Sequence, residues 1–491
     1  MDHTTLEAKF RSEIPYDYGT EEYNLYATLI PLLGRPRKLL VITDIEQDRD
    51  DLLAVILLSH MHSLGIIELV GCVANHRPSD KRAKFLKTVL HVLGTPEIPV
   101  AVGTDGTGGR ENRTLYWHEL QNQTFEEQDW NKGEQIDGYT LIHQLVDSQF
   151  NPQKLTALNI SSFQDLSEYL KTQDDETIQK HFAKVVSQGG YEIVEGSIKP
   201  DWTAMNNKFN REAASYVTNR LDELSIPSDA WGKQVAVAAA LDRSFLKTLL
   251  GPLGHHLRWV SAHQDYKYYF DALHKPFMPH LGKTWLLEIY MGLNRDSDEF
   301  LEMLDQPLSF HTFLKTGKFP AYDACAAMGA LGDDVLQCLG ILSTSAKPSE
   351  LHPHRMFGKS RNDLGGVDAS KLKWVLQVFL QGSLKATYKR AEEIIPTSTL
   401  RYSSPSYSIT LDIFRRQQPY MEILEDFKRT KGIQPEETER FIRDTFGENK
   451  LLDSAGHPVR DIHGQVCPMI PEEIPYKLLF MADGGATYLQ D

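Results

Sequence analysis

The segment Thr43–Asp51, with the sequence TDIEQDRDD, concentrates acidic side chains that could hold a metal ion. Only Arg49 offsets them locally, and the acids are Asp44, Glu46, Asp48, Asp50 and Asp51. Carboxylates this close together repel one another unless a cation or shared protons neutralise them. A hard divalent cation with oxygen ligands is the simplest solution, and an acidic loop that only caps a helix is the structural alternative.

Apolar segments on both sides of this loop indicate how it is positioned. The run RKLLVITD before it is short and rich in branched residues, which predicts a buried strand. The run DDLLAVILLSHMHS after it has the composition of a helix. We therefore expect the acidic loop at the carboxyl end of a strand, the edge at which open α/β sheets bind ligands.

The same alternation of strand and helix continues to about residue 245. IIELVGCVAN, IPVAVG, KLTALNIS and HFAKVVSQGG are typical of strands, whereas SDKRAKFLKTVLHVLG, DGYTLIHQLVDS and REAASYVTNRLDEL are typical of helices. Such units predict an α/β fold, a Rossmann-like open and mostly parallel sheet with helices on both faces.

We expect three parts along the chain. Residues 1–36 are predicted to be an N-terminal arm laid on the domain, and residues 37–330 are predicted to be the α/β domain that carries the site. Residues 331–491 are predicted to be a mostly helical C-terminal extension, because they contain stretches such as KLKWVLQVFLQGSLKATYKRAEEI and EETERFIRDTF.

The composition excludes some classes of partner. The 491 residues include 52 Lys and Arg against 67 Asp and Glu, so the net charge of −15 argues against binding to nucleic acid or to anionic membranes. Cys72, Cys325, Cys338 and Cys467 form no CxxC pair, which favours a reducing compartment. The N-terminus has no signal-peptide core, and the longest apolar run, Leu52–Leu58, is too short to span a bilayer. A cytoplasmic enzyme is therefore expected.

Three carboxylate motifs compete for the acidic loop. An EF-hand needs Gly at its sixth position and Glu at its twelfth, where a loop starting at Asp44 has Arg49 and Val55. The phosphatase motif Asp-x-Asp-x-Thr/Val is half met, with Asp44 as the nucleophile and Glu46 in place of the second Asp. The third motif, Asp-x-Asp-Pro-Gly-x-Asp-Asp before an apolar helix, has its acids at the positions of Asp44, Glu46, Asp50 and Asp51.

This third motif is typical of the inosine–uridine-preferring nucleoside hydrolase family, which the chain resembles over roughly residues 37–330. Further similar segments follow in the family's order. VANHRP aligns Asn75 with a Gly-Asn, NISSFQDL aligns Ser162 with the Thr of Gly-Pro-Leu-Thr-Asn, and SQGG is similar to Met-Gly-Gly. AMNNKFNREAA aligns Asn206, and FPAYDACAAMGAL aligns Asp323 with the Asp of a late His-Asp.

The resemblance implies one Ca²⁺ ion at the bottom of a ribose pocket. The implied ligands are Glu46, Asp51, the Ser162 main-chain carbonyl and Asp323, with Asp44 beside them. Asp50 would be the base that activates water against the anomeric carbon of a ribosyl group, with an oxocarbenium-like transition state. The implied activity is hydrolysis of the N-glycosidic bond of a ribonucleoside or related ribosyl compound, in purine or pyrimidine salvage.

Five further residues are candidates for contacts with the substrate. Asn75 and Asn206 would hold ribose hydroxyls, and Ser197 roughly replaces a ribose-binding Asn. His76 follows Asn75 and is a candidate to face the pocket. Trp202 is a candidate to stack on a base, with core packing as the alternative.

The chain departs from the family pattern at several of its polar contacts. Gln47 and Asp48 replace Pro-Gly, Ala204 stands in place of a ribose-binding Glu, and Tyr322 replaces the His before the last Asp. Because polar partners decide which hydroxyls a site accepts, these changes predict a different substrate, such as one modified at the ribose 5′ position.

Two alternative functions stay open. One is a metal-binding pseudoenzyme whose C-terminal half binds a protein partner, and the other is a metal-dependent phosphatase that uses Asp44 as its nucleophile. The resemblance also implies a homo-oligomer, either a dimer or a tetramer.

Overall fold

The run RKLLVIT forms the central strand β1 (Arg37–Thr43), because its branched apolar side chains suit a strand that is covered on both faces. Residues 39–42 are almost completely buried. Helix α3 (Arg49–Ser63) follows, and strand β2 (Ile67–Ala74) then pairs with β1 in parallel. This unit places the acidic loop between the end of β1 and the start of α3.

The computed structural model divides into two units, and each is described by itself. Unit 1 comprises Met1–Leu241 and Pro320–Arg390, and unit 2 comprises Asp242–Phe319 and Ala391–Asp491. The structure describes residues 3–46, 48–108, 135–147, 154–251, 253–254, 256–258, 260–261, 282–293, 295–306, 317–343, 349–351, 353–394, 476–480 and 486–490.

Within these residues, nine strands of unit 1 form one sheet in the order β12-β13-β9-β6-β5-β1-β2-β3-β4. Eight are parallel, and only β12 at the edge is antiparallel. The remaining strands are β3 (Val100–Val102), β4 (Ile136–Asp137), β5 (Leu155–Asn159), β6 (Phe182–Gln188), β9 (Ser228–Trp231), β12 (Ser349–Leu351) and β13 (His354–Phe357). The strand order reverses between β1 and β5, which makes the carboxyl ends of these two strands a topological switch point.

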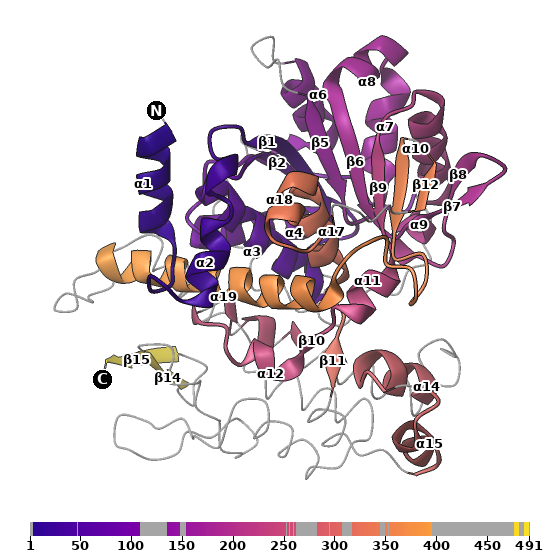
Figure 1. Ribbon diagram of the computed structural model, residues 1–491. Helices are drawn as coiled ribbons and strands as arrows, with labels where there is room; N and C mark the ends of the chain where they lie inside the picture. The colour runs from indigo at the N-terminus through magenta and orange to yellow at the C-terminus, as the bar shows by residue number, and fades with distance from the viewer. Residues whose placement is uncertain are drawn as a thin grey trace. The chain divides into compact units, whose positions relative to one another are not determined.

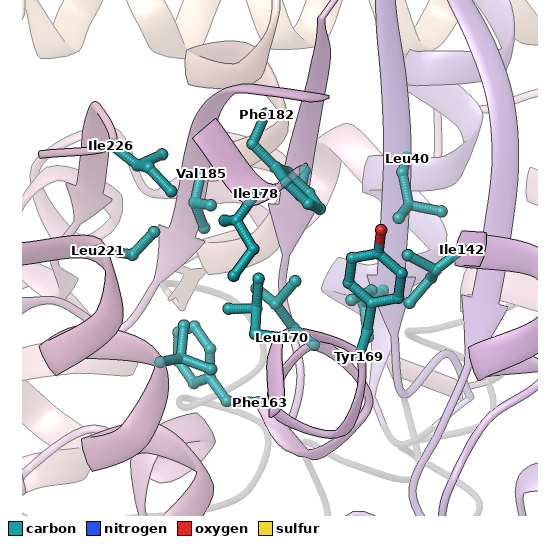
Figure 2. Packing of buried hydrophobic residues seen from close by; sticks show 14 of the residues in the cluster. Leu40, Ile142, Phe163, Tyr169, Leu170, Ile178, Phe182, Val185, Leu221 and Ile226 are labelled. Atoms are coloured by element: carbon teal, nitrogen blue, oxygen red, sulfur yellow. The ribbon is translucent and has the colours of Figure 1, made fainter. Parts of the chain in front are cut away.

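One face of the sheet is covered by helices and a continuous apolar core, and Figure 2 shows part of this core. The helices are α6 (Gly138–Asp147), α7 (Gln164–Thr172), α8 (Asp175–His181) and α10 (Arg211–Glu223). Leu40 and Ile42 of β1 join this core with Tyr169 of α7 and Ile142 of α6. Side chains alternate along a strand, so Leu39 and Val41, which are equally buried, point to the opposite face.

Helices α3 and α17 (Tyr322–Ala330) contact each other, and α17 also contacts β5, β6 and β9. Their residues are absent from the core on the α7 face and are almost all buried. The predicted helices on both faces of a mostly parallel sheet are therefore confirmed.

The N-terminal segment and helix α19 (Ala369–Ile394) lie against α3 (Figure 1). The Tyr26 hydroxyl hydrogen-bonds to Nε2 of His60 on α3 at 2.7 Å, and the Tyr26 ring packs edge-on against Phe379 at 5.0 Å between centroids. Tyr16 donates to the Val378 carbonyl at 2.7 Å. The segment contains α1 (His3–Glu13), α2 (Glu21–Ala27) and η1 (Ile30–Leu32).

The remaining elements belong to unit 1 or to unit 2. In unit 1 they are α4 (Ser79–Val92), the antiparallel hairpin β7 (Tyr191–Val194) and β8 (Ser197–Pro200), α9 (Met205–Phe209), α11 (Lys233–Ala238) and α18 (Asp333–Cys338). From the end of unit 1 through unit 2 they are β10 (Leu241–Asp242), α12 (Arg243–Leu246), α14 (Lys283–Trp285), η4 (Leu286–Tyr290), α15 (Asp298–Asp305), β11 (Lys318–Phe319), β14 (Tyr476–Phe480) and β15 (Ala486–Gln490).

The predicted boundaries at residues 36 and 330 stay predictions. In the C-terminal extension, the described residues form α18 and α19, the strands β12 and β13 of the main sheet, and the separate strand pair β14 and β15. The helix predicted for EETERFIRDTF lies outside the described residues. Among the described helices, none combines the length and apolar character that a bilayer crossing requires.

Candidate metal centre

The loop after β1 turns sharply before α3 begins. Glu46 has a left-handed backbone, with φ 76°, which side-chain-bearing residues seldom adopt. Arg82 of α4 holds this turn, because its Nη1 donates to the main-chain carbonyls of Asp44 and Ile45, the latter at 2.7 Å. Asp48 is the extended residue that precedes the first turn of α3. The turn therefore directs the following acids to the amino end of a helix, where the helix dipole favours negative charge.

Helix α17 contributes the last acid, Asp323, in its first turn. Its sequence YDACAAMGA is rich in small residues, and these let the helix approach its neighbours closely. A β-carbon at Gly329 would overlap the Trp231 indole of β9, so glycine is required there. The main-chain N–H of Asp323 donates to Oδ2 of Asp50 at 3.4 Å, which joins the two helices at the site.

Four carboxylates converge at this point of unit 1. Each offers one oxygen, and these oxygens lie within 4.8 Å of one another; the residues are Asp48, Asp50, Asp51 and Asp323. Asp50, Asp51 and Asp323 are each at most 6% exposed. Oδ1 of Asp48 is also buried and has no hydrogen-bond partner among the described residues. A buried oxygen without a donor, beside three buried carboxylates, fits a hard divalent cation such as Ca²⁺ or Mg²⁺.

The raised pKa values of the clustered carboxyl groups also favour a bound cation. Burial raises the pKa of Asp48, Asp51 and Asp323 well above the ordinary value, and the neighbouring carboxylates raise it further. The pKa of Asp50 is also raised, again mainly by burial. Ionised carboxylates this close in a buried site need a counter-charge, which a bound cation supplies.

The sequence-based ligand set and the observed cluster overlap only in part. Asp51 and Asp323, predicted as ligands, lie in the cluster together with the predicted base Asp50. The predicted ligands Asp44 and Glu46 are also buried, each 4% exposed, but lie outside this group of four. Their roles as ligands stay predictions.

Strand β5 places Ser162 beside the acidic loop. Asn159 at the end of β5 pairs with Ile42 of β1, and the next residue, Ile160, donates its N–H to the Ile42 carbonyl at 2.9 Å. The Ser162 carbonyl accepts a hydrogen bond from Nδ2 of Asn75 at 3.0 Å. Asn75 follows β2 and also donates its main-chain N–H to the Thr43 carbonyl at 2.9 Å, so the loops after β1, β2 and β5 meet at this edge.

The other predicted substrate contacts lie after β2, on α9 and at the start of the hairpin strand β8. His76 is 2% exposed, has φ 69°, and packs edge-on against Phe209 at 4.8 Å between ring centroids. Asn206 on α9 donates to Oε1 of Gln188 at 2.8 Å, which fixes it at the end of β6. Ser197 is partly buried and begins β8.

Trp202 lies on the turn between β8 and α9. It is 38% exposed, and the Arg211 guanidinium lies 5.3 Å from its ring centroid. Core packing, the alternative role for this residue, is therefore wrong. Stacking on a base stays a prediction.

Three residues of the site were missed by sequence analysis as site residues. Asp48 lies in the cluster although it stands where the motif has Gly. The signal that could have indicated it is the alternation of acids along Asp44, Glu46, Asp48 and Asp50. Arg82 holds the turn, and Asp165 of α7 binds Asn75 at 2.7 Å. Neither contact has a sequence signal, because each joins residues that lie far apart in the chain.

The fold is similar to the folds of two effector proteins of known structure. The type III effector protein XopQ complexed with adenosine diphosphate ribose aligns with a TM-score of 0.57 and 19% identity, over 78% of this chain and 99% of its own. The effector protein XOO4466 aligns with a TM-score of 0.56 and 18% identity, over 78% and 98%.

A nucleoside hydrolase itself is a weaker match. The purine-preferring ribonucleoside hydrolase from Gardnerella vaginalis aligns with a TM-score of 0.43 and 15% identity, over 71% of this chain and 99% of its own. No protein-family model and no curated protein matches the chain. At these identities the likeness concerns the fold, and the predicted resemblance is confirmed at that level.

Proposed function

We propose that this chain is a metal-dependent N-ribohydrolase that cleaves the N-glycosidic bond of a ribonucleoside or a related ribosyl compound. The observation that carries this proposal is the convergence of four carboxylates, three buried and one half-buried, at the switch point of the sheet. A cluster of negative charge favours a reaction in which positive charge develops on the sugar, as it does in an oxocarbenium-like transition state.

In this proposal Asp48, Asp51 and Asp323 hold a Ca²⁺ ion together with the Ser162 carbonyl, and Asp44 and Glu46 support the loop or add ligands. A bound divalent cation supplies Lewis acidity that makes a water more acidic, and it orients ribose hydroxyls. Oxygen ligands alone, with no His or Cys among the four, are the donor set that Ca²⁺ prefers.

Asp50 is the proposed general base. It lies in the first turn of α3, and the Asp323 N–H that donates to its Oδ2 orients one of its oxygens. Burial raises the pKa of Asp50, which makes its carboxylate a stronger base than an exposed one. Its task is to accept the proton from the attacking water.

The substrate is proposed to extend from this edge toward the end of β6. Asn206 and Ser197 would contact the sugar, His76 would line the pocket, and Trp202 would stack on a base. Both N–H groups of Asn75 are bound within the protein, so its contact with ribose would be made through its remaining acceptor capacity. Because XopQ, which has a similar fold, binds adenosine diphosphate ribose, substrates carrying a 5′ phosphate belong in any test.

The test measures release of the free base, together with ribose or its 5′-substituted form, from nucleosides, 5′-nucleotides, nicotinamide nucleosides and adenosine diphosphate ribose, with Ca²⁺ and with a chelator. We expect chelator-sensitive release from at least one compound, and a loss of about 10²–10⁴-fold in Asp50→Ala. Asp80→Asn, which changes an exposed acid in the first turn of α4, is the matched control and should keep full activity.

Three outcomes would contradict the proposal in different ways. Full activity in Asp50→Ala would exclude Asp50 as the base. Tight Ca²⁺ binding without release from any compound would favour the pseudoenzyme. Phosphate release that depends on Asp44 and on Mg²⁺ would favour the phosphatase.

A further inference from the structure

A buried carboxylate outside the cluster joins three of the loops at this edge. Asp165, in the first turn of α7, is 2% exposed. Its Oδ2 accepts hydrogen bonds from Nδ2 of Asn75 at 2.7 Å and from Oγ1 of Thr104 at 2.8 Å, and its Oδ1 accepts one from the Thr104 main-chain N–H at 2.8 Å. Asn75 follows β2 and Thr104 follows β3, so one side chain connects the ends of two strands to the helix after β5.

The Asn75 amide transmits this contact to the Ser162 carbonyl. Its Nδ2 also donates to the Ser162 carbonyl at 3.0 Å, and its Oδ1 accepts from Oγ of Ser161 at 2.5 Å. An ionised carboxylate can only accept hydrogen bonds, so Asp165 decides which end of the amide faces inward. A reversed amide would set its oxygen against the oxygens of both Asp165 and Ser162.

The loop that carries Ser162 is held on its other side as well. The Ser162 hydroxyl donates to the Gly106 carbonyl at 2.6 Å, in the loop that Thr104 begins. The Ser162 carbonyl itself is held by the Asn75 amide, which donates to this oxygen.

We propose that Asp165 is a positioning residue that, through Asn75, directs the Ser162 carbonyl toward the cation of the four-carboxylate cluster. This inference rests on the proposed function, because it requires a cation at the cluster. Asp165 touches neither substrate nor cation in this arrangement. It acts as the outer partners of metal ligands do, by fixing the orientation of a ligand.

The buried position of Asp165 favours a positioning role over an ordinary surface contact. Burial raises the pKa of Asp165, while the hydrogen bonds from Asn75 and Thr104 lower it. The hydrogen-bond partners Asn75 and Thr104 both donate to this carboxylate, which suits its ionised form. The hydrogen bonds from Asn75 and Thr104 account for the position of the Asp165 carboxylate without a basic side chain.

The experiment titrates full-length, chelator-treated protein with Ca²⁺ and measures affinity by calorimetry, beside the free energy of unfolding in chelator. Asp165→Asn keeps the size of the side chain but removes its acceptor-only character. We expect its Ca²⁺ affinity to fall about 10–100-fold, the usual effect of losing an outer partner of a metal ligand.

Thr104→Val is the matched control, because it removes one hydrogen bond from the same carboxylate and leaves Asn75 in place. It should lower the free energy of unfolding while the Ca²⁺ affinity stays within about twofold, as expected for a contact that does not orient Asn75. If Asp165 had only a structural role, Asp165→Asn would behave like this control: its free energy of unfolding would fall while its Ca²⁺ affinity would not.

A double-mutant cycle with Asn75→Ala tests the route through Asn75. In the Asn75→Ala background, Asp165→Asn should cause no further loss of affinity. An equal loss in both backgrounds, or an unchanged affinity in Asp165→Asn alone, would overturn this inference while the proposed function stands. Wild-type protein that binds none of Ca²⁺, Mg²⁺ and Mn²⁺ would overturn both.

Discussion

At the scale of single residues, the site is a concentration of negative charge that the fold tolerates at a cost. Asp51 and Asp323 are buried, and burial is the main reason that their pKa values are raised. The helix dipole at the start of α3 offsets part of this charge, but only by a fraction of what burial costs. In the absence of a cation, removing one of these charges should therefore stabilise the protein.

We expect Asp323→Asn to raise the free energy of unfolding in chelator at pH 8 by about 1–3 kcal/mol, the penalty for an unsatisfied buried polar or charged group. Because the pKa of Asp323 is raised in the folded state, folded protein binds more protons than unfolded chain, and stability falls as pH rises from 3.8 to the raised pKa. The advantage of the variant should therefore shrink as pH is lowered through this range. Denaturant unfolding at several pH values measures it.

Asp80→Asn, at an exposed position, serves as the control and should change stability little at any pH. A variant Asp323→Asn less stable than wild type in chelator at pH 8 would show that the Asp323 carboxylate makes a favourable contact without the cation. Added Ca²⁺ should make the wild type more stable than Asp323→Asn, because the Asp323 carboxylate then binds the cation and the variant lacks this carboxylate.

The residue scale also marks the limit of sequence analysis. The motif indicated Asp50 and Asp51 from their spacing, and the order of later segments indicated Asp323. Asp165 was not predicted, because its importance depends on Asn75, which lies 90 residues away in the chain. A buried acid on an amphipathic helix has no local pattern that separates it from an exposed one.

At the scale of elements, the N-terminal segment and α19 form a layer that depends on a single glycine. A β-carbon at Gly382 would overlap the Tyr26 hydroxyl and would lie 3.0 Å from Cγ of Pro15. The same hydroxyl is bonded to His60 of α3, so it has little room to move. The close approach of these two segments therefore requires glycine inside a long helix.

Helix propensity and packing predict opposite effects for Gly382→Ala. Alanine is favoured over glycine in a helix by about 1 kcal/mol, whereas overpacking costs about 1–3 kcal/mol. We expect overlap with a fixed hydroxyl to dominate, so the variant should be less stable than wild type, measured as a lower midpoint of denaturant unfolding. Adding Tyr26→Phe, which removes the hydroxyl, should recover part of the loss relative to Tyr26→Phe alone. An increase in stability for Gly382→Ala would contradict this account.

The main strands and helices of the α/β core followed from sequence patterns, but the short elements did not. The hairpin of β7 and β8 turns through Glu195 and Gly196, which have φ 53° and 81°. Two consecutive positive φ values are typical of a tight hairpin turn. Ile193 and Val194 beside it are partly exposed, so the alternation that would reveal a half-buried strand is lost.

At the scale of the whole molecule, cation binding should be visible as stability. A ligand present at about 100 times its Kd stabilises the folded state by about 2.7 kcal/mol. We expect Ca²⁺ to raise the thermal unfolding midpoint of wild-type protein and chelator to lower it. Asp51→Asn should respond far less, and NaCl at matched ionic strength controls for general screening. Equal responses in wild type and Asp51→Asn would place the cation elsewhere.

The packing of α3 has a consequence for how the protein is made on the ribosome. Helix α3 lies near the start of the chain, but its covering layer includes Tyr26 and Phe379, which are separated by most of unit 1. At roughly 5–20 residues per second, about 20–80 s pass before Arg390 has been synthesised. During that interval α3 and its apolar side chains lack their final cover, so nascent chains of intermediate length should be the species that most need chaperones.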